Sequence, residues 1–263
     1  MTHTLAGKRG LIMGVANDRS IAWGIARAMH GAGAELAFTY QGEAFGKRLE
    51  PLAASVGSDF MVDVDVTDDA SLDAAFKALG ARWDSLDFVV HAVAFSDKSE
   101  LTGRFLNTSR ANFNNSMDIS CYSFIEVARR AHPMMVENGG TLITLTYQGS
   151  NRVAPNYNVM GVAKAALESA TRYLANDLGP EGIRVNAISP GPMKTLAGAA
   201  IGGARKTYKH TEQNTPLRAN ATLEAVGGTA VYLASDAGAC TTGEIIHVDG
   251  GFHVLGMPQA ENL

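Results

Sequence analysis

The sequence predicts a single α/β domain built on a doubly wound parallel sheet of about seven strands. Short apolar runs alternate with longer segments of helical periodicity along all 263 residues, as is typical of a parallel sheet covered by helices on both faces. No repeat, low-complexity tract or linker divides the chain, and its length suits one large domain. Such a sheet binds its ligand beyond the carboxyl ends of its strands, so we expect the site there.

The predicted elements follow one another in a regular order. We expect strands at residues 9–13, 35–40, 60–64, 88–92, 141–146, 184–188 and 244–248. We expect the main helices at residues 21–30, 44–54, 72–83, 122–131, 157–178 and 223–233. The segment 72–83 illustrates the helices, because its apolar residues at 72, 76, 79 and 83 share one helical face. The segment 88–92 illustrates the strands, because its nearly unbroken apolar run suits a strand buried on both faces.

Composition and charge exclude several classes of protein. The chain is 46% hydrophobic and carries 22 basic and 26 acidic residues, a net charge of −4, which gives no electrostatic basis for nucleic-acid binding. Two cysteines are too few for a disulfide scaffold, and no early apolar run is long enough for a signal segment or membrane span. The seven histidines show no metal-binding spacing. We expect a cytoplasmic protein without a metal or an integral membrane segment, and peripheral association with the inner membrane stays open.

The first predicted strand runs into a turn that begins and ends with glycine. The segment GVANDRSIAWG spans Gly14 to Gly24, and glycines allow a tight turn and a close approach to a pyrophosphate. The start of the next helix, at Ile21, supplies free N–H groups, and Ser20 is placed as its N-cap or as a phosphate donor. The spacing is not the usual G-x-G-x-x-G, so an ordinary structural turn is the alternative.

The choice of nucleotide depends on the end of the second strand, where Gln41 follows Thr39 and Tyr40. A carboxylate there would accept the ribose hydroxyls, and an arginine would meet a 2′-phosphate. Gln41 can bond both hydroxyls without repelling either nucleotide, which favours NAD(H). Asp65 and Val66 follow the third strand and would suit the adenine edge, although Asp65 is equally interpretable as a solvated turn residue.

A tyrosine and a lysine seven residues apart form the sharpest catalytic signal. Tyr157 and Lys164 would lie on one face of the predicted helix. The lysine ammonium could hold a cofactor ribose and favour phenolate character in the tyrosine, which could donate to a developing oxyanion. Such pairs also arise by chance. The position of this one, ten residues after Tyr147 at the end of the fifth strand, favours a site.

Five blocks of the sequence resemble the short-chain dehydrogenase/reductase superfamily, and within it the bacterial enoyl-acyl-carrier-protein reductases. They are the divergent glycine loop at residues 14–24, ELAFTYQ at 35–41, YNVMGVAK at 157–164, GPEGIRVNAIS at 179–189 and GEIIHVDGGF at 243–252. The resemblance covers nearly the whole chain. It implies a Rossmann fold, usually in a homotetramer, that reduces trans-2-enoyl thioesters on acyl carrier protein with a nicotinamide cofactor, here expected to be NADH, in fatty-acid elongation.

The resemblance also implies the roles of individual residues. Tyr157 would bond the thioester carbonyl, Tyr147 would line the acyl pocket and help to deliver a proton to Cα, and Lys164 would hold the nicotinamide ribose. Ser96 matches a substrate-contacting position. The positions that match the family's cofactor site are Gly14, Ser20, Ile21, Gln41, Asp65, Val66, Val93, Lys164, Met193, Lys194, Thr195, Leu196 and Ala197.

A glycine-rich segment, LAGAAIGG at residues 196–203, follows the sixth strand. We expect it to belong to a substrate lid near residues 192–213, and a surface helix over 196–203 is the alternative. Arg205, Lys206 and Lys209 in this segment could meet an acidic carrier protein or form an ordinary solvated face. Two positions depart from the family pattern. Ala94 replaces a frequent glycine, which leaves inhibitor sensitivity open, and Lys194 replaces a frequent arginine.

The spacing of the tyrosine favours conjugate reduction within the superfamily. Its ketone reductases usually place the tyrosine four residues before the lysine, where Met160 stands in this chain. Tyr157 is displaced by one turn, roughly 4.5 Å, and conjugate reduction puts the charge on an oxygen further from the hydride acceptor. The alternatives are a carbonyl (3-oxoacyl) reductase and a nucleotide-sensing protein without catalysis. Met160 disfavours the first, and the joint presence of Tyr147, Tyr157 and Lys164 disfavours the second.

Overall fold

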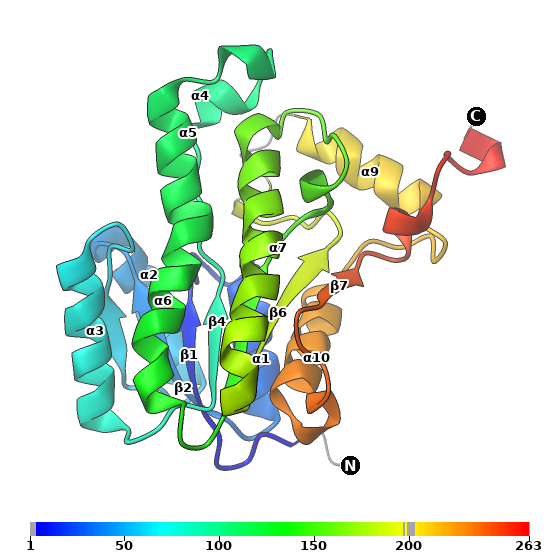
Figure 1. Ribbon diagram of the computed structural model, residues 1–263. Coiled ribbons are helices and arrows are strands. Elements are labelled where there is room, and N and C mark those ends of the chain that lie inside the picture. The colour runs from blue at the N-terminus through cyan, green and yellow to red at the C-terminus, as the bar shows by residue number, and fades with distance from the viewer. Residues whose placement is uncertain (1–3, 197, 199–202, 263) are drawn as a thin grey trace.

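The residues described by a computed structural model, 4–196, 198 and 203–262, form a seven-stranded sheet between two layers of helices (Figure 1). The strands are β1 (Arg9–Met13), β2 (Glu35–Tyr40), β3 (Met61–Asp63), β4 (Phe88–His91), β5 (Gly140–Leu145), β6 (Ile183–Pro190) and β7 (Ile245–Val248). Their order is β3-β2-β1-β4-β5-β6-β7, and every neighbouring pair is parallel. The predicted doubly wound α/β fold is confirmed.

Helices cover both faces of the sheet. One layer consists of α1 (Ile21–Gly31), α2 (Glu43–Ser55) and α10 (Leu223–Ala234). The other consists of α3 (Asp69–Arg82), α6 (Ser123–Ala131) and α7 (Asn158–Leu178). Toward the upper end of Figure 1 lie α4 (Lys98–Leu101), α5 (Arg110–Met117) and α9 (Ala204–Asn214). The short 3₁₀ turns are Phe105–Asn107, His132–Met134, Gln148–Ser150, Gly179–Glu181, Asp236–Gly238, Phe252–Val254 and Ala260–Asn262.

The predicted strands and main helices agree with the structure to within a few residues. The third strand is shorter than predicted, at Met61–Asp63, and the sixth is longer, at Ile183–Pro190. Helix α3 begins at Asp69, earlier than the apolar pattern indicated, because the Asp68 side chain accepts a hydrogen bond from the Ala70 N–H and caps the helix. The sequence pattern did not predict α4, α5 or α9.

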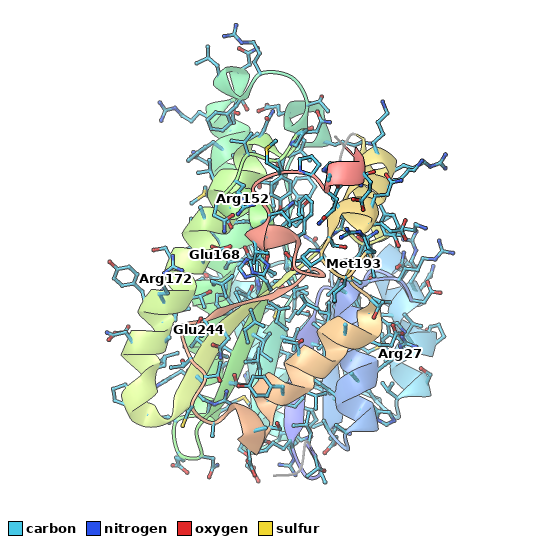
Figure 2. All side chains as sticks on the ribbon, turned by 90° about the vertical axis from the view of Figure 1, so that its right-hand side faces the viewer. Arg27, Arg152, Glu168, Arg172, Met193 and Glu244 are labelled. Carbon is cyan, nitrogen blue, oxygen red and sulfur yellow. The ribbon has the colours of Figure 1, made fainter. Side chains whose placement is uncertain are left out.

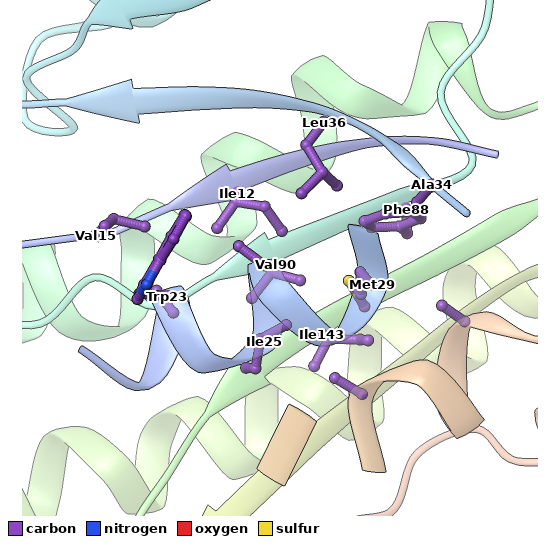
Figure 3. Packing of buried hydrophobic residues seen from close by; sticks show 14 of the residues in the cluster. Ile12, Val15, Trp23, Ile25, Met29, Ala34, Leu36, Phe88, Val90 and Ile143 are labelled. Carbon is purple, nitrogen blue, oxygen red and sulfur yellow. The ribbon is translucent and has the colours of Figure 1, made fainter. Parts of the chain in front are cut away.

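An apolar layer between α1 and the sheet holds the first half of the fold together (Figure 3). Ile12, Ile25, Met29 and Phe88 are fully buried there, and Trp23 is 5% exposed. Burying one such side chain contributes about 1.5–3 kcal/mol. This packing fixes where α1 begins, and therefore where its N-terminal N–H groups stand at the end of β1.

Gly24 lies inside helix α1 and makes a helix contact possible. A Cβ atom at this position would stand only 2.8 Å from the Leu223 Cβ, so glycine is needed for the close approach of α1 and α10. The expectation that Gly24 shapes the cofactor turn is therefore wrong, because the turn ends before the residue is reached.

The chain changes direction across the sheet between β1 and β4. β1 pairs with β2 on one side and with β4 on the other, so the connections leaving these two strands diverge at their carboxyl ends. Doubly wound sheets bind ligands at such a switch point. Among the helices of the described residues, none combines the length and apolar character needed to cross a bilayer.

Candidate active site

The turn after β1 packs tightly against the segment that follows β4. Gly14 has a φ of +92°, and a Cβ atom there would lie 2.2 Å from the Ala92 carbonyl oxygen. Only glycine suits both the conformation and the space. The carboxyl ends of β1 and β4 are thereby held close together, at the switch point of the sheet.

Ser20 stabilises this turn from within. It occupies the N-cap position of α1, but its side chain does not cap the helix. The hydroxyl oxygen instead accepts hydrogen bonds from the Ala16 and Asn17 N–H groups, both at 2.9 Å. The predicted position is correct, whereas the expected capping bond is not formed. The first N–H groups of α1, beginning at Ile21, lack intrahelical partners and can hold a pyrophosphate.

Two carboxylates flank the turn that carries Gln41. Asp65 accepts hydrogen bonds from the Thr67 N–H at 2.9 Å and the Thr67 hydroxyl at 2.7 Å, and together with a bond from Gln41 they hold its pKa below the usual value. Asp63 accepts from the Gly42 N–H at 2.8 Å. Asp65 is therefore a turn residue, as one interpretation of the sequence held, and also an anion in contact with Gln41.

The nearby cations on α2 are already engaged. Lys47 pairs with Glu43 one helical turn away, and the Arg48 guanidinium lies over the Phe45 ring, 5.7 Å from its centroid. A 2′-phosphate beside Gln41 would therefore meet carboxylates rather than a free cation. The residues present fit the adenosine half of NAD(H).

Tyr157 lies immediately before the first residue of α7, at the carboxyl edge of the sheet. Its side chain is buried, with 7% exposed, in a small apolar cluster with Leu101 and Met160. The Tyr147 ring stands edge-on to it, with the two centroids 5.1 Å apart. These contacts fix the orientation of the Tyr157 ring and place both hydroxyl-bearing rings in one apolar pocket.

The hydroxyl of Tyr157 stays protonated. Burial raises the pKa of Tyr157, and Tyr147 and Glu168 raise it further. Burial also raises the pKa of Tyr147. The expectation that Lys164 favours phenolate character in Tyr157 is therefore wrong, because burial raises the pKa of Tyr157 and Lys164 is not among the groups that shift it. A neutral phenol remains a hydrogen-bond donor, which is what a developing oxyanion requires.

Lys164 is a buried cation at the end of β5. Lys164 is 6% exposed, and its ammonium donates a hydrogen bond to the Leu145 carbonyl oxygen at 2.8 Å. Burial lowers the pKa of Lys164 from its usual 10.5 to about 8, although Cys121 and Glu168 act in the opposite direction. At neutral pH the group is mostly an ammonium, held in one place by a single backbone acceptor.

A buried polar layer beneath Lys164 was not predicted. Glu168 lies one turn further along α7 and accepts from the Thr146 hydroxyl at 2.7 Å. His91, fully buried, bonds the Ser123 hydroxyl through Nε2 at 2.9 Å. Burial, with a contribution from Lys164, lowers the pKa of His91 to about 3, so its ring is neutral. The spacing of Lys164 and Glu168 by four residues was the signal that could have revealed part of this layer.

The segment after β4 contributes residues predicted for both ligands. Val93 packs partly buried against the core on the α3 and α6 side of the sheet, as does Val66. Phe95 is 52% exposed. The Ser96 hydroxyl donates to the Asn112 Oδ1 at 3.3 Å, so this side chain points into the protein, in a segment that follows β4 at the carboxyl end of the sheet.

The segment after β6 holds most of the remaining predicted residues. Met193 packs against the α1 side of the core, and the Thr195 hydroxyl oxygen accepts from the Gly198 N–H at 2.9 Å. The Lys194 ammonium lies 4.5 Å from the centroid of the Tyr208 ring.

Leu196 is 49% exposed, whereas Ala197 and part of the expected lid lie outside the described residues. Within residues 4–196, 198 and 203–262, no group of three or more histidine, cysteine, aspartate and glutamate side chains could hold a metal ion.

The arrangement is that of a nicotinamide-dependent reductase of the short-chain dehydrogenase/reductase class, in which one helix presents a tyrosine and a lysine beside a dinucleotide turn. The family model described as Enoyl-(Acyl carrier protein) reductase matches residues 14–253. The chain belongs to this family.

Individual relatives agree with this assignment along their whole length. The chain is 59% identical to the enoyl-[acyl-carrier-protein] reductase [NADH] 2 of Rhizobium meliloti, over 100% of this chain and 98% of the relative. The enoyl-(acyl-carrier-protein) reductase of Anaplasma phagocytophilum, solved in complex with NAD, is 54% identical with a TM-score of 0.93, over 98% and 96% of the two chains. FabI from Candidatus Liberibacter asiaticus is 55% identical with a TM-score of 0.96, over 98% and 100%.

Proposed function

We propose that the protein reduces the trans-2 double bond of enoyl thioesters carried by acyl carrier protein, with NADH as the reductant, in fatty-acid elongation. The observation that carries this proposal is the buried, neutral Tyr157 one turn before the usual tyrosine position, which Met160 fills. The phenol can therefore donate a hydrogen bond to an oxygen that is not attached to the carbon receiving the hydride.

The proposed reaction has two steps, a conjugate addition of hydride and a protonation. Bound NADH supplies a hydride, which adds to Cβ while the double-bond electrons move to the thioester carbonyl oxygen. Tyr157 donates a hydrogen bond to that oxygen and stabilises its negative charge. Lys164 fixes the nicotinamide ribose. Tyr147 lies beside Tyr157 and helps to direct a proton to Cα, where the enolate collapses to the saturated thioester.

A direct test compares two thioesters of equal chain length. With purified protein and NADH, we expect rapid NADH oxidation with a trans-2-enoyl thioester and turnover at least about 100-fold slower with the 3-oxoacyl thioester. Preferential turnover of the 3-oxoacyl thioester would assign the protein to carbonyl reduction. NADH binding without turnover of either substrate would make it a nucleotide sensor.

The preference for NADH over NADPH is expected to depend on Asp65. We expect kcat/KM with NADH to exceed that with NADPH by at least about tenfold, because the carboxylate beside Gln41 repels a 2′-phosphate. Asp65→Asn should raise kcat/KM for NADPH by about threefold or more and leave that for NADH nearly unchanged. The exposed Asp84→Asn is the matched control. A wild-type preference for NADPH would overturn the interpretation of Gln41.

The affinity for NADH is expected to fall at alkaline pH as Lys164 loses its proton. Because the pKa of Lys164 is about 8, the dissociation constant should stay flat below that pH and rise about tenfold per unit above it. In the folded protein the pKa of Lys164 is about 8, below the usual 10.5. Between these two pH values the unfolded chain binds more protons than the folded one, so the contribution of Lys164 to the free energy of unfolding becomes more favourable to the folded state as the pH rises. A loss of NADH affinity above about pH 8 would therefore not be explained by unfolding due to deprotonation of Lys164.

Fluorescence titration of NADH across this range checks the prediction. Lys164→Met, which keeps the side-chain length and removes the charge, should bind weakly with no such pH dependence. An unchanged wild-type dissociation constant through about pH 9 would contradict it.

We propose that the protein forms a homotetramer in the cytoplasm and binds its carrier through a separate surface. We also propose that residues near 192–213 form a substrate lid. Exposed apolar side chains lie along α5 to α7, namely Phe113, Tyr122, Val162 and Tyr173. The edge strand β7, which begins directly after Glu244, lies on the side of the molecule that faces the viewer in Figure 2. The exposed Arg205, Lys206 and Lys209 on α9 would meet an acidic carrier. Light scattering of the purified protein tests the tetramer.

A further inference from the structure

A row of polar residues runs along one face of the helix that leads from α5 through a π-helical turn, Asp118–Tyr122, into α6. Its members follow one another at spacings of three, four, four and three residues, which keeps them on one side of the helix. We call them the polar ladder: Ser109, Asn112, Ser116, Ser120 and Ser123. Apart from the half-buried Ser109, they are at most 6% exposed.

Every member of the polar ladder bonds the chain between the end of β4 and the end of α4. The contacts, in order along the helix, are Ser109 Oγ to Glu100 Oε1 at 2.7 Å, Asn112 Oδ1 to the Asp97 N–H at 2.9 Å, Ser116 Oγ to Ser96 Oγ at 2.9 Å, Ser120 Oγ to the Phe95 N–H at 3.0 Å and Ser123 Oγ to His91 Nε2 at 2.9 Å. The segment 95–97, which follows β4 at the carboxyl end of the sheet, is therefore held at each residue.

Asn112 is the centre of this network. Besides the Asp97 N–H, its Oδ1 lies 3.3 Å from the hydroxyl oxygens of both Ser96 and Ser116. Its Nδ2 donates to the Glu100 Oε2 at 3.3 Å. One buried amide thus bonds Ser96, Asp97 and Glu100, and its loss would leave the Asp97 N–H without its acceptor.

The chain just after this segment is also tied to the catalytic helix, at Glu100. Asn158, next to Tyr157, donates from Nδ2 to the Glu100 carbonyl oxygen at 2.9 Å, and its φ of +34° is unusual for a residue other than glycine. Ser120 lies 3.8 Å from the Met160 sulfur. Residues 95–100 are therefore held between the polar ladder and the helix that follows Tyr157.

We infer that Asn112 and Ser116 are positioning residues for the enoyl substrate: by holding the Ser96 side chain and the Asp97 N–H, they set the wall against which the acyl thioester lies beside Tyr157. The inference rests on the proposed function. The nucleotide-binding turn after β1 makes no bond to the polar ladder in the contacts above, so the effect should fall on the acyl substrate rather than on NADH.

The test compares Asn112→Ala with Asn115→Ala, which removes the same side chain from an exposed position of the same helix. For Asn112→Ala we expect KM for the enoyl thioester to rise about tenfold, kcat to fall by no more than about threefold and KM for NADH to stay within about twofold of wild type. Hydrogen exchange should accelerate at the Asp97 amide, which loses its acceptor, and stay unchanged in α1. Asn115→Ala should match wild type in every measurement.

Ser116→Ala removes only the hydroxyl that contacts Ser96 and Asn112 and keeps the Asn112 bond to the Asp97 N–H. It should show the same pattern at about threefold in KM, so it decides the question if Asn112→Ala does not fold. The inference would be overturned if the Asn112 and Asn115 variants behaved alike. It would also be overturned if the KM values for the enoyl thioester and for NADH rose equally and hydrogen exchange accelerated throughout the protein. Failure of the wild-type protein to reduce any enoyl thioester would instead refute the proposed function, while the exchange measurement would still report on how the polar ladder holds Asp97.

Discussion

Replacing Tyr157 by phenylalanine is expected to lower kcat for enoyl reduction by about 10²- to 10³-fold, the usual effect of removing one oxyanion donor. The ring would keep its place among Leu101, Met160 and Tyr147, because these contacts are apolar. Only the hydroxyl is lost, and it is the protonated donor that burial maintains. The affinity for NADH should therefore change by no more than about twofold.

Steady-state kinetics and an NADH titration on the same preparation check this result. Tyr173→Phe, a change at an exposed tyrosine of the same helix, is the matched control and should behave as wild type. A Tyr157→Phe variant with the wild-type kcat would show that the charge on the thioester oxygen is stabilised elsewhere.

Replacing Lys164 by alanine is expected to lower kcat/KM by about 10³-fold, equivalent to about 4 kcal/mol of transition-state stabilisation. Two effects combine. The ammonium that would hold the ribose disappears, and the Leu145 carbonyl oxygen loses its donor. In contrast to the tyrosine variant, the affinity for NADH should fall by at least about tenfold.

Lys164→Met separates the charge from the volume of the side chain. It fills most of the space that alanine would leave empty, so its midpoint of thermal unfolding should stay near wild type while its NADH affinity falls as in the alanine variant. Lys77→Met, on the exposed face of α3, serves as the control. Wild-type NADH affinity in Lys164→Met would show that the ammonium does not hold the cofactor.

The sheet and its main helices could be predicted because hydrophobic burial determines them. Strands buried on both faces leave continuous apolar runs, and helices covering the sheet leave apolar stripes. Helix α5 leaves neither, since its sequence RANFNNSM contains three asparagines, which have low helix propensity, and buries a polar face. Its partners are the polar groups of the segment 95–100, and such tertiary hydrogen bonds have no periodic signature in the sequence.

The site was predictable in position but not in protonation. Tyr157 and Lys164 do lie at the carboxyl edge of the sheet, and Gly14 does occupy the turn after β1. The charge state of Tyr157 could not be foreseen, because it depends mainly on how deeply tertiary contacts bury the ring. The position of Ser20 was predicted correctly, but its hydrogen bonds were not, since the hydroxyl accepts from backbone N–H groups of the preceding turn and does not cap the helix.

The position that receives the hydride tests the central claim most directly. A trans-2-enoyl thioester is reduced with NADH that carries deuterium at its transferable position on nicotinamide C4, and the product is examined by nuclear magnetic resonance. The proposed conjugate reduction predicts one deuterium at Cβ and one solvent-derived hydrogen at Cα. Deuterium at Cα, or no transfer from the cofactor to the acyl chain, would contradict the role given to Tyr157 and the reaction proposed for this protein.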